Sequence, residues 1–199
     1  MSLSPLLDQL ERALRCLPGV GQRTASRMAL HLLERNRAGG LHLALALEAA
    51  MTQIGECQQC AVPTEDALCQ FCADTTRDHR IWCVVCGPAD VQAIEQSGLF
   101  QGKYHCLRGT LSPLDGRGPE DIGLPSLYAR IEAEQPSELI IALPSTVEGE
   151  ATTFQIQATL GRRLRVTRLA QGVPVGGDLG QLDATTLSHA LLSRTEVPS

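Results

Sequence analysis

The sequence is 199 residues long, with 43% hydrophobic and 3% aromatic residues and a formal net charge of −5. A chain of this length and hydrophobicity can bury a core of aliphatic side chains, which excludes an intrinsically disordered protein. The longest apolar stretch, residues 41–51, is too short to cross a bilayer, and the first residues lack the pattern of a signal peptide, so we expect a cytoplasmic protein without a membrane partner.

The N-terminal part of the chain is expected to be helical. Residues 4–15 begin with Ser4 and Pro5, which favour the first positions of a helix, and a second helix is expected over residues 22–34. Residues 41–54 alternate Leu and Ala almost with period two. They still predict a helix, because strong helix formers dominate and β-branched residues are nearly absent.

The first two of these helices flank Leu-Pro-Gly-Val-Gly at residues 17–21, a pattern typical of a helix–hairpin–helix motif. Gly19 and Gly21 carry no Cβ, so their backbone amides can approach a phosphate at the N-terminus of the next helix. Arg23 and Arg27 are four residues apart and share a face of that helix. The motif predicts DNA binding that is independent of base sequence. The alternative is a plain helical hairpin with solvated arginines.

The charge of the chain is unevenly distributed. Residues 11–37 contain six arginines and two glutamates, whereas residues 112–150 contain eight acidic residues and two arginines. Binding of a polyanion therefore has to be judged from the local field, because the net charge of the whole chain says little about it.

Four of the eight cysteines form two Cys-x2-Cys pairs that are separated by eight residues. Four thiolates complete the tetrahedral shell of one Zn²⁺ ion per chain and leave no position open for a substrate, so the ion would be structural. A pair of redox dithiols is the alternative. The expected ligands are Cys57, Cys60, Cys69 and Cys72.

A third Cys-x2-Cys pair, Cys83 and Cys86, is not expected to bind a metal ion. It lies in a β-branched and aromatic run that predicts a buried strand over residues 81–85. Residues three apart in a strand point to opposite faces, so these two thiols are expected to pack in the core rather than share a metal ion. The five histidines show no ligand spacing and are expected at the surface or on helices.

From residue 80 onward, predicted strands and helices alternate. Such alternation favours a mostly parallel sheet covered by helices. The expected strands are 81–85, 104–107, 137–143 and 165–170, the expected helices are 89–96, 126–134, 147–161 and 183–193, and residues 109–124 are expected to form a long loop.

The order of these motifs resembles that of the bacterial RecR recombination proteins. The resemblance runs from Ser4 to Leu192 and rests on LPGVGQRTASRMALHLL, the four-cysteine segment, LSPLDGRGPEDIGL, TVEGEAT and GVPVGGDL. It implies an α+β fold of several modules: the helix–hairpin–helix region, a four-cysteine zinc finger, and an α/β Toprim domain with a mostly parallel sheet. The expected boundaries are 1–56, 57–72 and 80–175, followed by a C-terminal segment with a helix at 176–199.

The resemblance also implies a function in recombinational DNA repair by the RecF pathway. It implies a homo-oligomeric ring, expected to be a tetramer, that clamps gapped DNA or single-strand/double-strand junctions. It further implies RecO and RecF as partners, with an indirect link to RecA recombinase and the single-stranded-DNA-binding protein SSB. The protein would then be associated with the nucleoid.

The resemblance to Toprim enzymes raises the question of catalysis. In the catalytic relatives, a Glu after the first strand and an Asp-x-Asp pair after a later strand bind Mg²⁺. The corresponding positions here are Cys86, Pro144 and Thr146, which offer no carboxylate. A non-enzymatic DNA clamp is therefore expected. The alternatives are a Mg²⁺-dependent DNA-cleaving or primase-like Toprim enzyme and a protein adaptor whose hairpin never touches DNA.

Three acidic residues remain in the Toprim-like part: Glu148, Glu150 and Asp178. They could form a partner-docking patch or a weak Mg²⁺ site. Alternatively they face water, since Glu148 and Glu150 fall in the first turn of a predicted helix, where acids stabilise the helix dipole. Gly176 and Gly177 are not followed by the lysine of a phosphate-binding loop, so nucleotide binding is weakly supported.

Overall fold

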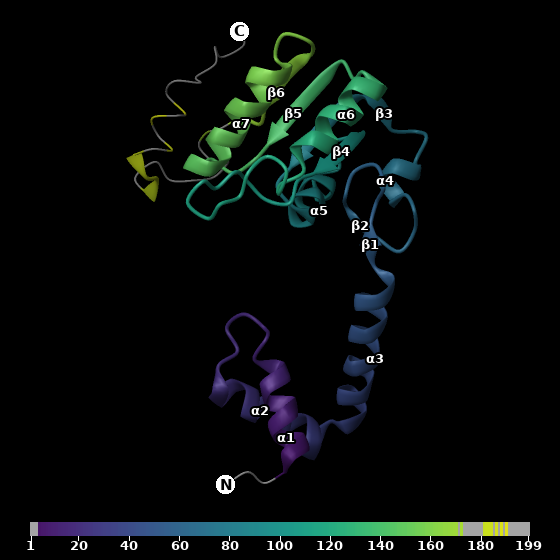
Figure 1. Cartoon of the computed structure of the whole chain (residues 1–199), viewed down its shortest axis with the longest axis vertical. Coiled ribbons are helices and arrows are strands. Elements are labelled where there is room, and N and C mark those ends of the chain that lie inside the picture. Colours follow the sequence, from purple (N-terminus) through teal and green to yellow (C-terminus); the bar gives the residue numbers. More distant parts are fainter. Residues whose placement is uncertain are drawn as a thin grey trace. The chain divides into compact units, whose positions relative to one another are not determined.

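The computed structural model describes residues 4–170, 172, 181–184, 186, 188 and 190. The chain divides into two compact units, Met1–Gly55 and Glu56–Ser199 (Figure 1). Over the described part of the chain, no helix combines the length and the apolar character that a membrane span requires.

The first unit consists of three helices, α1 (Pro5–Leu14), α2 (Gln22–Arg35) and α3 (Arg37–Gln53). Two alanines of α2, at positions 25 and 29, are fully buried, and their small side chains allow the neighbouring helices to pack closely. The third helix begins earlier than residue 41, where the sequence predicted it, because the Asn36 side chain caps it by accepting a hydrogen bond from the Gly39 amide at 2.9 Å.

The cysteine segment contains short elements that the sequence did not predict. Strands β1 (Gly55–Glu56) and β2 (Pro63–Thr64) pair with each other, and α4 (Gln70–Ala73) is a single helical turn. Elements of this length carry no periodic pattern that a sequence can reveal.

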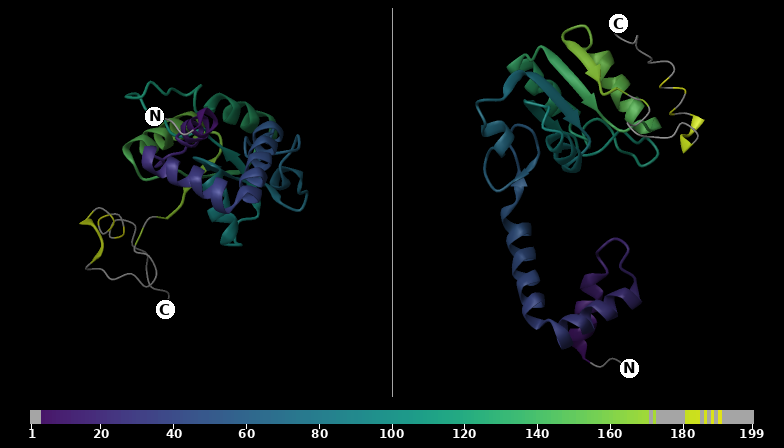
Figure 2. Two further views of the ribbon diagram at one scale, coloured as in Figure 1. Left: turned by 90° about the horizontal axis from the view of Figure 1, so that it is seen from below. Right: turned by 180° about the vertical axis from the view of Figure 1, so that it is seen from behind.

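The remainder of the second unit is built on a four-stranded sheet of β3 (Asp78–Val85), β4 (Gly102–Cys106), β5 (Glu138–Ala142) and β6 (Arg165–Arg168). The strand order is β4-β3-β5-β6 and every pair is parallel (Figures 1 and 2), so the prediction of an α/β region is confirmed. The carboxyl ends of the neighbouring strands β3 and β5 consequently lie at one edge of the sheet.

Helices α5 (Pro88–Gln96), α6 (Leu124–Glu134) and α7 (Val147–Leu160) complete this unit. Side chains of β3 alternate between two cores. Trp82 packs with residues of α6 and α7, whereas Cys83 packs with α5 and with the four-cysteine segment. The sheet thus has one face covered by helices alone and another that shares its core with the cysteine segment.

The expected C-terminal segment, 176–199, lies largely outside the described residues. Of the helix predicted over 183–193, the described positions 184, 186, 188 and 190 are helical. Position 183, where that helix was predicted to begin, is described and is not helical. The other positions of the predicted helix and Asp178 lie outside the described part of the chain.

Candidate DNA-contact and metal sites

The turn between α1 and α2 has a backbone geometry that favours glycine at position 19. Gly19 has a φ of +76°, in the left-handed region that side chains disfavour, and the Val20 amide closes the turn on the Leu17 carbonyl at 3.2 Å. A Cβ built on Gly19 or on Gly21 would meet no atom within 4 Å. The space in front of both glycines is therefore open to a ligand.

The N-terminal end of α2 is also open. Gly21 is its N-cap and supplies no side-chain hydrogen bond, and no acidic residue lies in the first turn. Amide groups at such an end carry a partial positive charge, and the nearest carboxylate shown, Glu11 of α1, accepts a hydrogen bond from the Gln22 side chain at 3.1 Å. This end of α2 can accept an anion.

The arginines of the first unit fall into two groups. Arg12, Arg15 and Arg37 are held by hydrogen bonds within the unit, to the Asp8 carbonyl, the Gln22 side chain and the Leu33 carbonyl respectively. Arg23 and Arg27 are exposed, and among the described residues neither has a hydrogen bond or an ion pair. Their guanidinium groups are therefore available to an external partner.

The four cysteines predicted to bind a metal ion come together. Their sulfur atoms lie within 4.8 Å of one another, and all four side chains are buried. The Sγ atoms of Cys60 and Cys69 are 3.4 Å apart. Among the described residues, this is the one cluster of three or more such side chains, and Cys83 and Cys86 are not part of it. Four buried sulfur donors can hold one metal ion, and the donor set suits zinc.

The thiols of the cluster differ in how readily they form the thiolate, which is the form that binds metal. A hydrogen bond from Cys60 lowers the pKa of Cys72 to about 6, and the nearby Arg130 guanidinium acts in the same direction. Burial has the opposite effect at Cys69, whose pKa is raised. The pKa of Cys60 is raised as well, so Cys72 is the thiol of this cluster that most readily forms the thiolate.

Comparison with known proteins identifies the family. The model of the RecR helix-hairpin-helix matches residues 7–51, that of the Toprim domain matches residues 80–170, and that of the RecR C-terminal region matches residues 172–195. The chain is 54% identical over 198 residues to the recombination protein RecR of Stutzerimonas stutzeri (strain A1501), across 99% of both chains. It is 55% identical over 200 residues to that of Pseudomonas putida (strain W619), again across 99% of both.

The chain belongs to the RecR family. The resemblance inferred from the motifs is confirmed, as is the fold of N-terminal helices, a cysteine cluster and a Toprim α/β region.

The three positions at which the resemblance to Toprim enzymes led us to look for catalytic carboxylates lie at the carboxyl edge of the sheet. Cys86 directly follows β3, and Pro144 and Thr146 follow β5. Thr146 caps α7, since its hydroxyl accepts a hydrogen bond from the Gly149 amide at 3.1 Å. Asp90 supplies a carboxylate to the loop after β3, but that group accepts the amides of residues 86 and 87 at 3.1 and 3.0 Å.

The two remaining acidic candidates both lie in the first turn of α7, as predicted. Glu150 is exposed and forms an ion pair with Arg168 of β6 at 3.1 Å, whereas Glu148 is half-buried. A Cβ at Gly149, between them, would overlap the Pro144 carbonyl, so this turn packs tightly against the loop after β5. Over the described residues, these two carboxylates do not join a third acid, cysteine or histidine in a potential metal site.

Two features of the site were missed or wrongly predicted from the sequence. Arg35, at the end of α2, is exposed and has no bond among the described residues, so it extends the free positive charge of that helix. His105 was expected at the surface but is buried in β4, at 2% exposure, where burial and the charge of Arg130 lower its pKa to about 4. Its place in a predicted strand was the one available signal.

Proposed function

We propose that this RecR-family chain is a non-enzymatic protein that binds DNA independently of base sequence and acts in recombinational repair. The observation that carries the proposal is the pair of free arginines, Arg23 and Arg27, beside the uncapped N-terminus of α2 and the open glycine turn at Gly19 and Gly21. All of these groups suit phosphate oxygens, and none of them reads a base.

The place of the protein in repair follows from its family. Two relatives that align over nearly their whole length are named recombination protein RecR. We infer that the chain works with RecO and RecF, that its substrate is gapped or junction DNA, and that it helps to load RecA on DNA coated by SSB. Association with the nucleoid would follow from DNA binding of this kind.

A homo-oligomer is supported by the apolar surface of α3. No residue of this helix is buried, and its exposed leucines lie on opposite faces, with Leu41 and Leu45 on one and Leu43 and Leu47 on the other. A helix that is apolar on all sides is stable only when it is covered. We propose that other copies of the chain cover it, in a tetrameric ring that brings several hairpins to one DNA molecule and so raises the affinity.

The metal ion is proposed to be zinc, with a purely structural role. Four sulfur donors form a closed shell, so no coordination position remains for water or substrate. The proposed modules are the helix–hairpin–helix region (1–56), the zinc finger (57–72), the Toprim domain (80–175) and the C-terminal segment (176–199). The residues at 86, 144 and 146 support a Toprim domain without catalysis, because hard Mg²⁺ ions need oxygen ligands there.

Binding to gapped duplex DNA tests the proposal. We would compare the wild type with the double variant Arg23→Ala/Arg27→Ala by fluorescence anisotropy at several salt concentrations. The double variant should bind at least about tenfold more weakly, and its log–log salt slope should fall by about two, since each lost phosphate contact removes close to one unit. The variant should retain its helical content and its metal.

A matched control removes two arginines from the other unit. Arg162 and Arg163 are both exposed, after α7, and Arg162→Ala/Arg163→Ala should change affinity by less than twofold. Equal losses in both double variants would show that only overall charge matters. Unchanged binding by the Arg23/Arg27 variant would place the DNA contact elsewhere. An absence of binding even in the wild type at low salt would favour the protein-adaptor alternative.

A further inference from the structure

Strand β4 is an edge strand of the Toprim sheet, yet all five of its residues are buried. The four-cysteine segment lies against it. The amide of Cys106, the last residue of β4, donates to the carbonyl of Cys60 at 2.7 Å and so holds the first cysteine pair. Unpaired edge strands are prone to pairing with other chains, so this cover has a structural role beyond the metal ion itself.

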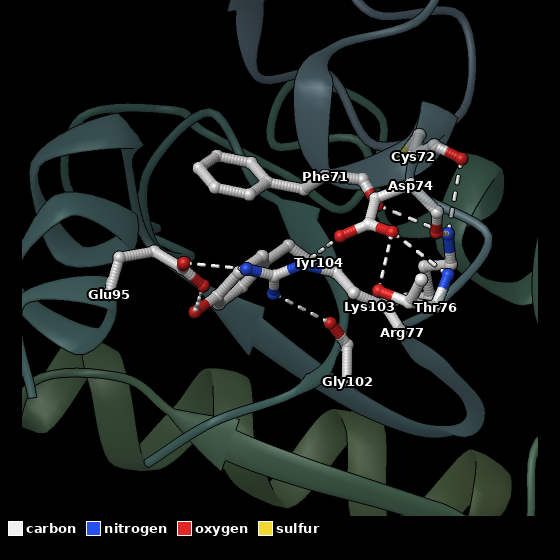
Figure 3. A network of polar contacts seen from close by, with 9 residues as sticks. All are labelled: Phe71, Cys72, Asp74, Thr76, Arg77, Glu95, Gly102, Lys103 and Tyr104. Atoms are coloured by element: carbon white, nitrogen blue, oxygen red, sulfur yellow. Dashed lines mark hydrogen bonds and ion pairs between the residues drawn. The ribbon is translucent and has the colours of Figure 1, made fainter. Parts of the chain in front are cut away.

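The second cysteine pair is held by Lys103, also in β4. Its Nζ donates to the carbonyl oxygens of Phe71 at 3.1 Å, Cys72 at 3.1 Å and Asp74 at 3.0 Å (Figure 3). The residue is 9% exposed. A tetrahedral ammonium can direct its three N–H groups to three converging carbonyls, which a planar guanidinium cannot do.

This residue stands out in the sequence as well. It is the single lysine of the chain, and the other 16 basic residues are all arginines. A buried ammonium is costly unless its hydrogen bonds are satisfied, and here all three are. None of the three acceptors is a carboxylate. The Asp74 carboxylate lies nearby, and hydrogen bonds from Thr76 together with the charges of Arg77 and Lys103 lower its pKa.

The neighbouring residue, Tyr104, contacts a side chain of the same segment, the ring of Phe71. Lys103 contacts the backbone of this segment, whereas Tyr104 contacts the side chain of Phe71, which lies between the two cysteines of the second pair. The Phe71 ring packs edge-on against Tyr104 with centroids 5.5 Å apart, and the Arg77 guanidinium lies 4.9 Å from the Phe71 centroid. Arg77 and the Tyr104 hydroxyl both bond to Glu95 of α5 at 2.6 Å (Figure 3).

The chemistry of the metal site explains why a cation is useful at this place. Four thiolates around one divalent ion leave a net charge of about −2, which is costly to bury against the core of a domain. Groups that orient metal ligands from behind commonly change metal affinity by about 10–100-fold when they are removed. Two buried cations lie near Cys72: Arg130, whose charge favours the Cys72 thiolate, and Lys103, which bonds directly to the Cys72 backbone.

We propose that Lys103 is a positioning residue of the four-cysteine metal site: its ammonium fixes the second cysteine pair against β4 and offsets the negative charge of the metal-bound thiolates. The environment of Lys103 is then coupled to metal occupancy. The inference rests on the proposed zinc site. Metal content measured by mass spectrometry tests the zinc site independently of the role of Lys103. A chain that holds no zinc as purified would overturn both.

The single lysine allows a direct test on the wild-type protein. Lys103 and the N-terminus offer the only two amines to an amine-acylating reagent, and peptide mass spectrometry separates the two stable amide products from each other and from any labile thioester at cysteine. In the zinc-loaded protein, Lys103 should label at least about tenfold more slowly than after zinc is removed with a chelator, with the N-terminal amine as internal reference. Equal labelling rates in the two states, whether fast or slow, would overturn the coupling while leaving the zinc site intact.

Variants test the positioning role. Zinc loss to a chromophoric chelator should be about tenfold faster for Lys103→Met, at the lower end of the range for such residues, and intermediate for Lys103→Arg, which keeps the charge without the three-carbonyl geometry. Arg80→Met is the matched control, because Arg80 is exposed and pairs only with Asp78 of its own strand at 2.8 Å. A rate for Lys103→Met within twofold of the control would overturn the proposal. If Lys103→Met does not fold, the rate of zinc loss from Lys103→Arg and the labelling experiment decide whether Lys103 positions the metal site.

Discussion

The two compact units of this chain, the helical unit (Met1–Gly55) and the Toprim unit (Glu56–Ser199), differ in how they are stabilised. The Toprim unit has two cores, with large side chains such as Trp82 and Leu139 fully buried, and a cysteine cluster that shares one of those cores. The helical unit has fully buried alanines in α2 and exposes leucines along α3. The Toprim unit therefore has extensive cores of its own, whereas the helical unit carries the surfaces that we propose for DNA and for other copies of the chain.

Removal of the metal should have the largest effect, and it should be confined to the Toprim unit. Cys60→Ser removes a ligand whose carbonyl also binds β4, so the unit should lose more than about 4 kcal/mol of unfolding free energy, as structural zinc sites contribute directly to folding. Hydrogen exchange should accelerate in β4. The exposed Cys16 gives the matched control Cys16→Ser, and equal exchange in the two variants would contradict a structural metal.

Replacement of one leucine by alanine in each unit should show that the two units differ in how much their leucines contribute to the free energy of unfolding. Leu139→Ala leaves a cavity in the core of the sheet and should cost about 2–5 kcal/mol of unfolding free energy, measured by urea denaturation. Leu45→Ala, on the surface of α3, should change that free energy by less than about 0.5 kcal/mol but lower the oligomer mass observed by light scattering. An unchanged mass would argue against α3 as the interface between copies.

The buried histidine predicts a pH dependence that belongs to the Toprim unit. His105 has a folded-state pKa of about 4, below the value of about 6.5 expected when unfolded. Between these values the unfolded chain binds more protons, so stability should fall as the pH decreases from 6.5 towards 4, by up to about 1.4 kcal/mol per pH unit. His105→Gln should flatten this dependence in urea titrations at pH 7 and pH 5. An identical slope in the variant would assign the effect to other groups.

The smallest effect is expected at the acidic residues of α7. Glu150→Ala breaks an exposed ion pair with Arg168 and should cost less than about 1 kcal/mol. Added Mg²⁺ should not raise the melting temperature of either protein, and neither should nick supercoiled plasmid. A Mg²⁺-dependent stabilisation or nicking that Glu148→Ala abolishes would revive the Toprim-enzyme alternative.

Local pattern accounts for most of the elements. Helix signals at Ser4 and Pro5 and the apolar run at residues 81–85 predicted α1 and β3, because periodicity and capping depend on residues that are near in sequence. The short elements β1, β2 and α4 were not predicted, since two to four residues hold no period.

Motif spacing similarly determined the candidate sites. Two Cys-x2-Cys pairs can close on one ion because each pair needs only a tight turn, so the cluster of four sulfurs could be predicted without a fold. The glycine turn and the arginines after it are likewise contiguous in sequence. The membership of the RecR family rests on the order of these local motifs, which the comparisons confirm.

Only the tertiary structure decided which groups meet across long separations. Lys103 contacts carbonyls about 30 residues earlier in the chain, and no periodic pattern encodes that meeting. Burial of His105 and the free state of Arg23 and Arg27 likewise depend on what the rest of the chain does or does not place beside them. The sequence by itself determined the longer elements, the four cysteines that come together and the family, because these are local or ordered features. Burial, charge compensation and partner choice are properties of packing, and they exist only once the strands and the cysteine segment have come together.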